Sequence, residues 1–274
     1  MKKGSKFLIA PYSIWMAIFI VIPMMLVAYF AFTDSDGNFT IGNIVRVGDY
    51  SNVFLRSIWL GTIATAVSLV LGYPLAYIIS KMNVKRQNMM IMLVMLPMWM
   101  NFLLRTYSWM TLLENNGIVN NILASLRLPR VQLINTPGAV VLGMVYNYIP
   151  YMILPIYSVL TKMDYSVIEA AQDLGADSRK VFLKVILPMS TPGLISGITM
   201  VFVPAVSTFI ISKMLGGGAN LLIGDLIDMQ FLGSAYNPNL GSAISLVLMI
   251  IILICIGIMN QFDDEESAAG GIII

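Results

Sequence analysis

The chain has 274 residues, of which 58% are hydrophobic and only 11% are charged. A soluble domain carries about 25% charged residues and could not hide this much apolar surface, so lipid must be the solvent for much of the chain. The sequence has no histidine and a single cysteine, Cys255, which excludes a histidine proton relay, a His/Cys metal site, a Ser-His-Asp hydrolase and an internal disulfide. The formal net charge of +2 gives no indication of a nucleic-acid partner.

Six uncharged windows divide the sequence, and they comprise residues 7–33, 57–80, 87–104, 131–161, 185–212 and 229–262. Each is long enough for the roughly 17–25 apolar residues that cross the hydrocarbon core as a helix. We therefore expect an all-α fold, a polytopic membrane protein with six transmembrane helices. No repeat with a period of 20–50 residues is present, and no linker indicates a second soluble domain.

The first window follows three lysines, as the apolar part of a secretion signal does. A signal has only about 7–15 apolar residues and ends at an A-x-A site, whereas this window is longer and has no such site. We expect it to be retained as a span that bends at Pro11 and Pro23, because proline removes a backbone donor. The third window is the shortest, and we expect its helix to continue past Arg105.

The distribution of basic residues favours an orientation with both termini in the cytoplasm. This orientation places ten of the 16 basic residues inside, namely Lys2, Lys3, Lys6, Lys81, Lys85, Arg86, Lys162, Arg179, Lys180 and Lys184. The short loop at residues 81–87 carries most weight, because short loops set the positive-inside bias. We divide the chain into a first span with its external loop (1–56), a five-helix core (57–262) and an acidic cytoplasmic tail (263–274).

In the cytoplasmic loop before the fifth window, residues 165–188 predict two short helices joined at a glycine. Ser166 and Glu169 fit the S-x-x-E capping box that begins a helix. Gly175 suits the left-handed position that ends one, and Asp177 can cap the next. This segment is therefore expected to form two short helices joined by a turn at Gly175.

One apolar face is predicted on the first of these helices, because Val167, Ala170, Ala171 and Leu174 recur at helical spacing. Helices that lie on a bilayer use bulky apolar anchors, whereas small residues permit close backbone approach. The alanines therefore favour docking into a groove of a protein. An amphipathic helix pair that lies on the bilayer remains the alternative.

The segment resembles the signature loop of the ABC-importer permeases, E-A-A-x-x-x-G followed after nine residues by I-x-L-P. Here the pattern reads Glu169-Ala170-Ala171, then Gly175, then Val185-Ile186-Leu187-Pro188, with valine in place of isoleucine as the single departure. In that family the loop forms coupling helices that sit in a cleft of a cytoplasmic ATPase subunit. The resemblance implies the type I ABC importer permease architecture. It also implies an ATPase-coupling role for Glu169, Ala170, Ala171, Asp173, Leu174, Gly175, Leu187 and Pro188.

Residues 71–76, 96–107, 215–218, 222–224 and 230–231 are similar to the B-type permease subunits of spermidine/putrescine importers. This resemblance implies a bacterial inner-membrane protein that imports polyamines. It also implies a homologous second permease of the C type, an ATPase subunit dimer that uses ATP and Mg, and an extracytoplasmic polyamine-binding protein. The chain itself would bind no cofactor and would catalyse no reaction.

A polycation needs acceptors along its path, and aromatic faces supply them through cation–π contacts worth about 0.5–2 kcal/mol. Candidate path residues are Trp99, Asn101, Tyr107, Trp109, Tyr146, Tyr148 and Tyr151, with Asp225 and Asp228 near the outer mouth. The aromatic residues equally fit an interfacial belt, and the two aspartates equally fit a solvated helix face. Arg105 and Lys213 would repel a polycation on the path, and they could instead reach the interface or pair with acids.

No acidic residue lies inside an uncharged window, so we expect a weak path whose selectivity comes from an external binding protein. Three alternatives stay open from the sequence. The first is an importer permease for another small solute such as an oxyanion. The second is a secondary transporter or channel, which would leave the segment around Glu169 without a role. The third is a membrane scaffold that transports nothing.

Overall fold

The structure, a computed structural model, describes residues 11–270 except residues 219 and 234. The first three lysines lie outside the described residues, as do the side chains of the acidic tail. The described part is almost entirely helical, and an isolated bridge between Thr33 and Phe39 closes the loop after the first span. This agrees with the expected all-α fold.

The helices follow one another along the chain with short connections. They are the π-helical turn η1 (Ala17–Val21), α2 (Ile22–Ala31), α3 (Gly42–Val47), η2 (Gly48–Tyr50), α4 (Ser51–Ser80), α5 (Val84–Met95), η3 (Leu96–Trp99), α6 (Phe102–Leu113), α7 (Ile118–Ser125), α8 (Pro137–Lys162), α9 (Tyr165–Asp173), α10 (Ser178–Val181), η4 (Phe182–Ile186), α11 (Leu187–Met189), α12 (Thr191–Ser207), α13 (Ile210–Leu215), α14 (Ile223–Phe231) and α15 (Pro238–Gly270).

Among the described residues, four helices are long and apolar enough to span a membrane: Pro11–Ala31, Gly42–Ser80, Pro137–Lys162 and Pro238–Met259. Two bent helix pairs bring the count to six if each pair forms one span. The six spans expected from the uncharged windows are thus all present as helical segments. Irregularity in the first span falls next to Pro23, where the π-helical turn η1 comes directly before α2.

The third span differs from the expectation. Its helix does not continue straight past Arg105, because Val84–Trp99 and Phe102–Ser125 meet at a bend of 87°. The side-chain oxygen of Asn101 accepts hydrogen bonds from the amides of Leu103 (2.9 Å) and Leu104 (3.3 Å), so a new helix begins there. Arg105 then donates from Nη1 to the carbonyl oxygen of Pro97 across the bend, at 2.7 Å.

The core is built from α4, α8 and α12, whose facing side chains form the largest buried cluster. Small residues let these helices approach closely, as in other membrane bundles. A Cβ atom on Gly193 would lie 3.0 Å from the carbonyl oxygen of Pro155, and one on Gly197 would lie 2.9 Å from the sulfur of Met152. A larger residue at either position would therefore push α8 and α12 apart or displace the Met152 side chain.

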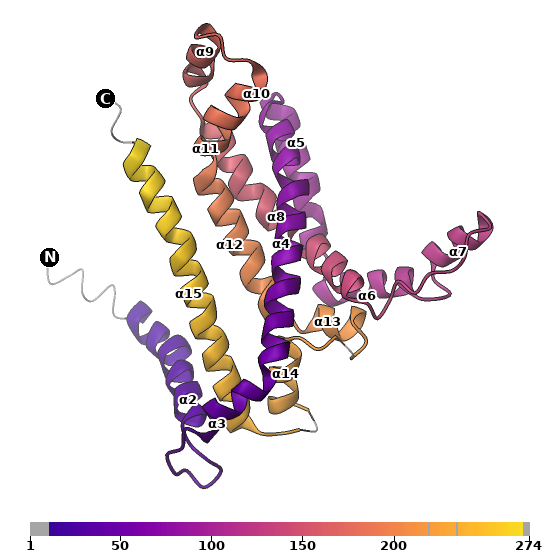
Figure 1. Cartoon of the computed structure of the whole chain (residues 1–274), viewed down its shortest axis with the longest axis vertical. Coiled ribbons are helices and arrows are strands. Elements are labelled where there is room, and N and C mark those ends of the chain that lie inside the picture. The colour runs from indigo at the N-terminus through magenta and orange to yellow at the C-terminus, as the bar shows by residue number, and fades with distance from the viewer. Residues whose placement is uncertain (1–10, 219, 234, 271–274) are drawn as a thin grey trace, which may run out of the picture.

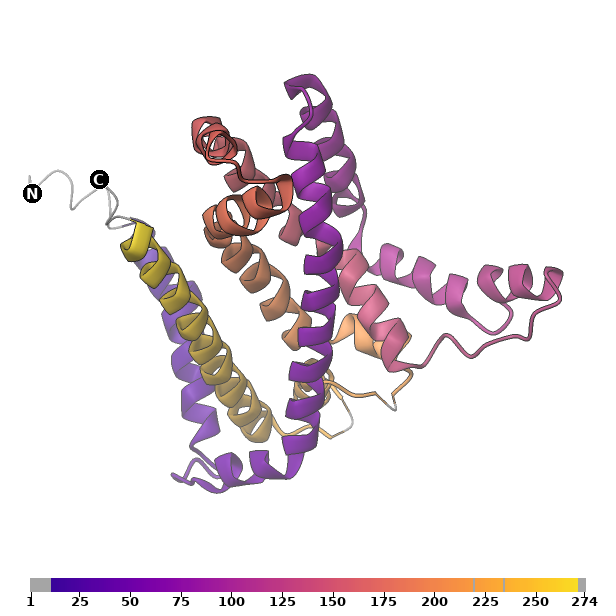
Figure 2. The ribbon, with the colours of Figure 1, turned by 45° about the horizontal axis from the view of Figure 1, so that its top comes forward.

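The first and last spans stand apart from this core. Figure 1 shows α2 and α15 side by side and leaning outward from the core, while α15 contacts α3, α14 and α12. A second buried cluster, which includes Ala31, Ala243 and Ile244, joins them. In the opposite direction α6 and α7 form an arm that projects from the bundle (Figure 2).

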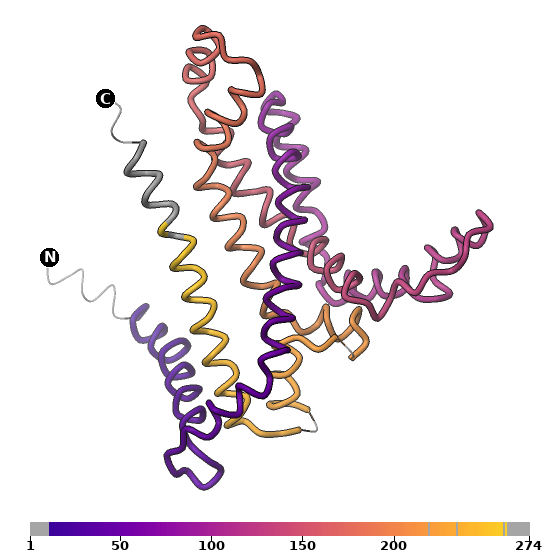
Figure 3. Tube along the Cα trace, viewed as in Figure 1, coloured from indigo at the N-terminus to yellow at the C-terminus, as the bar shows by residue number. Residues whose placement is uncertain are grey.

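The two ends of the bundle are distinct. The tube in Figure 3 shows α9, α10 and the turn between α4 and α5 at one end, and α3, α13 and α14 at the other. We call the first the coupling end and the second the mouth end. The residues predicted to couple to an ATPase and the two aspartates predicted near the outer mouth therefore lie at opposite ends.

Candidate functional site

The segment from α9 to α11, at the coupling end, begins with an aspartate cap. A carboxylate oxygen of Asp164 accepts a hydrogen bond from the amide of Ser166 at 2.9 Å, and α9 begins at Tyr165. The expected capping box of Ser166 with Glu169 is therefore wrong, because Asp164 stands earlier and satisfies the first exposed amide. The hydrogen bond from the Ser166 amide also lowers the pKa of Asp164 below its ordinary value.

The turn between α9 and α10 matches the sequence expectation. Gly175 adopts a φ of +82°, in the left-handed region where side chains are strained. Its amide donates to the carbonyl oxygen of Gln172 at 2.8 Å, and the next amide, of Ala176, donates to Ala171 at 3.1 Å. Asp177 then accepts from the amide of Lys180 at 2.9 Å and caps α10.

The apolar residues of α9 point in two directions rather than one. Ile168 is buried against Val181 and Ile186, and Ala171 packs on this small cluster. Val167 and Ala170 are exposed, and Leu174 is 90% exposed. Ile168, which the expected face omitted, holds α9 to its own chain. Ala171 helps to hold it, so the exposed residues alone remain for a partner.

Glu169 and Asp173 are also exposed. The outward surface of α9 therefore carries two carboxylates beside three apolar side chains. A cavity of about 290 Å³ lies beneath the helix, between Ile168 and the end of α4. Few side chains therefore tie α9 to the bundle.

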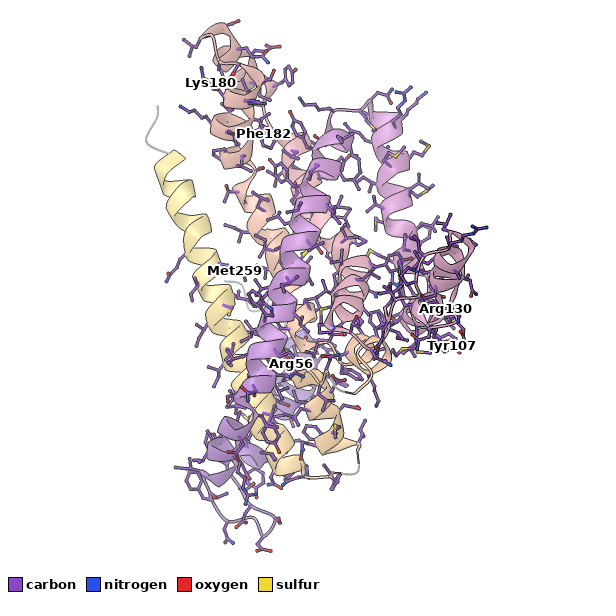
Figure 4. The ribbon with its side chains drawn as sticks, turned by 45° about the vertical axis from the view of Figure 1, so that its right-hand side comes forward. Arg56, Tyr107, Arg130, Lys180, Phe182 and Met259 are labelled. Atoms are coloured by element: carbon purple, nitrogen blue, oxygen red, sulfur yellow. The ribbon has the colours of Figure 1, made fainter. Side chains whose placement is uncertain are left out.

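Aromatic contacts connect this segment to the core. The ring of Phe182 meets Tyr73 and Tyr77 of α4 edge to face, with ring centroids 5.8 and 5.6 Å apart. Figure 4 shows Phe182 turned into the molecule at this end, near Lys180. The hydroxyl of Tyr73 also lies 2.9 Å from that of Ser190.

Ser190 sits at the break in the fifth span, where Ser178–Met189 and Thr191–Ser207 meet at 62°. Leu187 is partly buried against the main core and Pro188 is exposed, just before this break. Thus the residues of the I-x-L-P pattern form the joint between the α9–α11 segment and α12. The hydrogen bond between the hydroxyls of Tyr73 and Ser190 connects this joint to α4.

The structure brings some of the aromatic path candidates together and separates others. Trp109 of α6 and Tyr146 of α8 meet edge to face with centroids 5.3 Å apart. Tyr148 is buried in the core, 6.5 Å from the ring of Tyr151. These four form two separate pairs, one between α6 and α8 and one within α8.

Trp99 and Tyr107 are instead exposed, at 73% and 54%. Figure 4 shows Tyr107 out on the side of the projecting arm. Asn101 uses its side-chain oxygen to cap α6, and Arg105 is buried and bonded to Pro97. Arg105 therefore holds the bend, a role that no sequence pattern pointed to.

Asp225 and Asp228 of α14 share one face, as their spacing predicts, and both line a small pocket at the mouth end. A carboxylate oxygen of Asp228 lies 3.1 Å from the ammonium of Lys213. This confirms the expectation that Lys213 could pair with an acid. Asp225 is only 4% exposed. Burial raises the pKa of Asp225 above its ordinary value, although the Leu222 amide, Ser212 and Lys213 oppose this.

Contacts between distant parts of the chain, which no local sequence pattern indicates, also shape this end. The hydroxyl of Ser57 on α4 accepts a hydrogen bond from the amide of Ile223 at 2.8 Å and so fixes the start of α14. Lys213 and Asp228 are fifteen positions apart on different helices. Among the described residues, no group of three or more acidic or cysteine side chains gathers to hold a metal ion.

Comparisons with known proteins show which family shares this architecture. The family model for "Binding-protein-dependent transport system inner membrane component" matches residues 68–263. The spermidine/putrescine transport system permease protein PotB of Haemophilus influenzae is 36% identical over 264 residues, which cover 93% of this chain and 92% of that protein. PotB of Escherichia coli is 36% identical over 86% of this chain and 90% of its own length.

Solved structures share the fold at low identity. A chain of a bacterial ABC transporter involved in the import of the acidic polysaccharide alginate superposes with a TM-score of 0.76 at 18% identity, over 95% of this chain and 94% of that one. The methionine transporter MetNI gives a TM-score of 0.57 at 14% identity, over 79% and 95%. The family match and the PotB identities together show that the chain belongs to the inner-membrane permease components of binding-protein-dependent transport systems.

Proposed function

We propose that this chain is the B-type permease subunit of an ATP-driven ABC importer for polyamines of the spermidine and putrescine class. The observation that carries the proposal is the 36% identity to PotB along 93% of the chain. The alginate and methionine transporters share only the fold, so they do not bear on the substrate. The chain forms half of the translocation path and catalyses no reaction itself.

The partners follow from this assignment. An ATPase subunit dimer meets the coupling end and uses ATP and Mg, a homologous C-type permease completes the path, and an extracytoplasmic protein delivers the polyamine. The coupling end therefore lies in the cytoplasm with both termini of the chain. Its basic residues include Lys81, Lys85, Arg86 and Lys162, in agreement with the positive-inside bias.

Coupling runs through the joint described above. The exposed side chains of Val167, Ala170 and Leu174 dock into the ATPase, with Glu169 and Asp173 beside them. When the ATPase dimer closes, α9 moves with it. The cluster around Ile168 and Ala171 carries that motion to Phe182 and Ile186, because packed side chains transmit displacement.

From there the motion reaches two spans at once. Phe182 lies against the rings of Tyr73 and Tyr77 on α4, and the Tyr73 hydroxyl bonds to Ser190 at the break of the fifth span. A break between two helix segments is where a span can change its angle with little loss of packing. We infer that α12 pivots about Ser190 and opens the path alternately to either side.

Uptake into a strain that lacks this chain tests the proposal. Radiolabelled putrescine and spermidine should enter only when the gene is restored, in a background without a redundant polyamine system. Uptake should stop when ATP is depleted while the ion gradients are kept. Unchanged polyamine uptake in the deletion strain would overturn the polyamine assignment, and uptake that follows an ion gradient after ATP depletion would overturn the ABC importer assignment.

A further inference from the structure

The pocket at the mouth end contains a buried acidic oxygen that the fold leaves unused. Oδ2 of Asp225 accepts the Leu222 amide at 2.9 Å and so caps α14. Oδ1 is buried and has no hydrogen-bond partner among the described residues. A buried charged acceptor without a donor is costly, so such an atom calls for a donor, from water or from a ligand.

The pocket is lined by polar side chains that the fold holds in place and by the apolar side chains of Leu221 and Met229. Its lining includes Ser212, Lys213, Gly218, Asn220, Asp225 and Asp228. The amide nitrogen of Asn220 donates to the carbonyl oxygens of Asn135 and Gly216, at 3.3 and 3.2 Å. The hydroxyl of Ser212 donates to Phe209 at 3.0 Å. Two carboxylates therefore face a preformed hollow.

The volume of this hollow restricts what can enter. It measures about 70 Å³, whereas one water molecule occupies about 30 Å³ of the liquid. The hollow is therefore large enough for an ammonium group. An ammonium brings three N–H donors, which suits two carboxylates better than it suits a metal ion that requires about six to eight oxygens.

Lys213 shows how such a group would bind. Its ammonium already lies 3.1 Å from Asp228, yet the lysine side chain is 68% exposed and the aspartate side chain 18% exposed. An ion pair this open to water is weak. A second ammonium can therefore replace it without breaking a buried interaction.

We propose that the pocket binds one primary-ammonium end of the transported amine, with Asp225 as the fixed acceptor and Lys213 as a tethered ammonium that the ligand displaces from Asp228. This assignment rests on the proposed function for the identity of the amine. The chemistry of the pocket can nevertheless be tested apart from it. The site lies at the end opposite the coupling segment, where substrate would arrive.

The test uses the assembled transporter in lipid nanodiscs, with equilibrium binding of radiolabelled putrescine and competition by butylamine or KCl. Asp225→Asn keeps an oxygen for the Leu222 amide but removes the charge, and we expect affinity to fall by about tenfold or more, as for loss of a hydrogen bond to a charged group. Lys213→Gln removes the tethered competitor and should raise affinity by several-fold. Asp49→Asn, at an exposed acid of the same end, is the matched control and should bind as the parent does.

Displacement of putrescine by butylamine at concentrations at which KCl has no effect supports an ammonium site. Parent-like affinity in Asp225→Asn overturns the proposal, and so does displacement by KCl alone. If Asp225→Asn fails to assemble, unchanged affinity in Lys213→Gln overturns it instead. Cellular uptake keeps the two proposals apart. If cellular uptake overturns the polyamine assignment, competition by butylamine still tests the ammonium site. If Asp225→Asn binds as the parent does while polyamine uptake is normal, only the proposed site is overturned.

Discussion

The coupling end and the mouth end both carry aspartates near helix starts, and they use them in opposite ways. Asp164 and Asp177 are exposed, and each accepts a backbone amide at the start of a short helix. Asp225 also caps its helix, but it is buried and keeps one oxygen unpartnered among the described residues. The pKa of Asp164 is lowered by hydrogen bonds, whereas that of Asp225 is raised by burial.

This difference separates two kinds of carboxylate. A lowered pKa at an exposed cap marks a group whose charge already serves the fold. A raised pKa in a pocket marks a group whose charge costs stability until a cation arrives. The exposed aspartates of the coupling end thus serve as helix caps, whereas Asp225 of the mouth end has a carboxylate oxygen that no described residue partners.

The largest effect should come from the exposed surface of α9. Ala170→Asp places a charge where we propose that the ATPase docks, and it should abolish co-purification of the ATPase while the chain still inserts into the membrane. Ala171→Asp is the matched comparison, since Ala171 packs on the Ile168 cluster and its change should lower stability first. ATPase recovery from Ala170→Asp at the level of the parent would show that this surface is not the docking face.

Gly175→Val should have the next largest effect. A branched residue at a φ of +82° is strained by about 1–3 kcal/mol, so the α9–α10 turn should shift and transport should fall several-fold. Gly37 has the same φ in the loop after α2, and Gly37→Val is thus a control for strain alone. Equal transport losses in the two variants would mean that the turn has no special part in coupling.

A smaller effect is expected from Tyr73→Phe, which removes the hydroxyl that meets Ser190 at 2.9 Å. The lost hydrogen bond is worth about 1 kcal/mol, and the Phe182 ring contact remains. We expect more ATP to be hydrolysed per polyamine transported, measured in proteoliposomes. Tyr77→Phe keeps its own contact with Phe182 and should leave this ratio unchanged. A parent-like ratio in Tyr73→Phe would remove the hydrogen bond from the coupling route.

The smallest effect concerns pH. Burial raises the pKa of Asp225 in the folded state. The contribution of this carboxyl to folding stability is therefore fully present below its ordinary pKa, and it is lost as the pH rises through the raised pKa. Asp225→Asn should therefore be more stable than the parent at neutral pH, with the gap closing in acid. The charge of Lys213 lowers the pKa of Asp225, whereas the charge of Asp228 raises it. Thermal unfolding followed from acid to neutral pH measures the gap.

Asp164 provides the comparison for that experiment. Its pKa is lowered, so its contribution is present above the ordinary pKa and is lost as pH falls through the lowered value. Asp164→Asn should be less stable than the parent at neutral pH, with the gap closing in acid, so the stability difference has the opposite sign to that of Asp225→Asn. A difference of the same sign in both variants at neutral pH would contradict the distinction between the two ends.

Local chemistry in the sequence predicted much of this architecture. Uncharged windows located the spans because membrane helices are recognised by composition alone. Gly175 and Asp177 were predicted correctly because each acts on its immediate neighbours. The capping box at Ser166 failed within the same segment, since Asp164 competes for the same amide and a short motif does not show which of two caps will be used.

What the sequence could not show are the contacts between distant positions. Lys213 meets Asp228 and Ser57 meets Ile223 only because α13, α14 and α4 are packed together. The division of α9 into Ile168 inside and Leu174 outside likewise depends on where the end of α4 lies. Helical spacing gives the pattern of a face, but the neighbouring helices decide its direction.

The bend at Asn101 has a consequence for the surrounding bilayer. The straight part of the third span, Val84–Trp99, has 16 residues, which rise about 24 Å at 1.5 Å per residue. The hydrocarbon core is about 30 Å thick. The straight part alone is therefore shorter than the hydrocarbon core, so residues beyond the bend must complete the third crossing, whereas α4 and α15 are each long enough to cross as one helix.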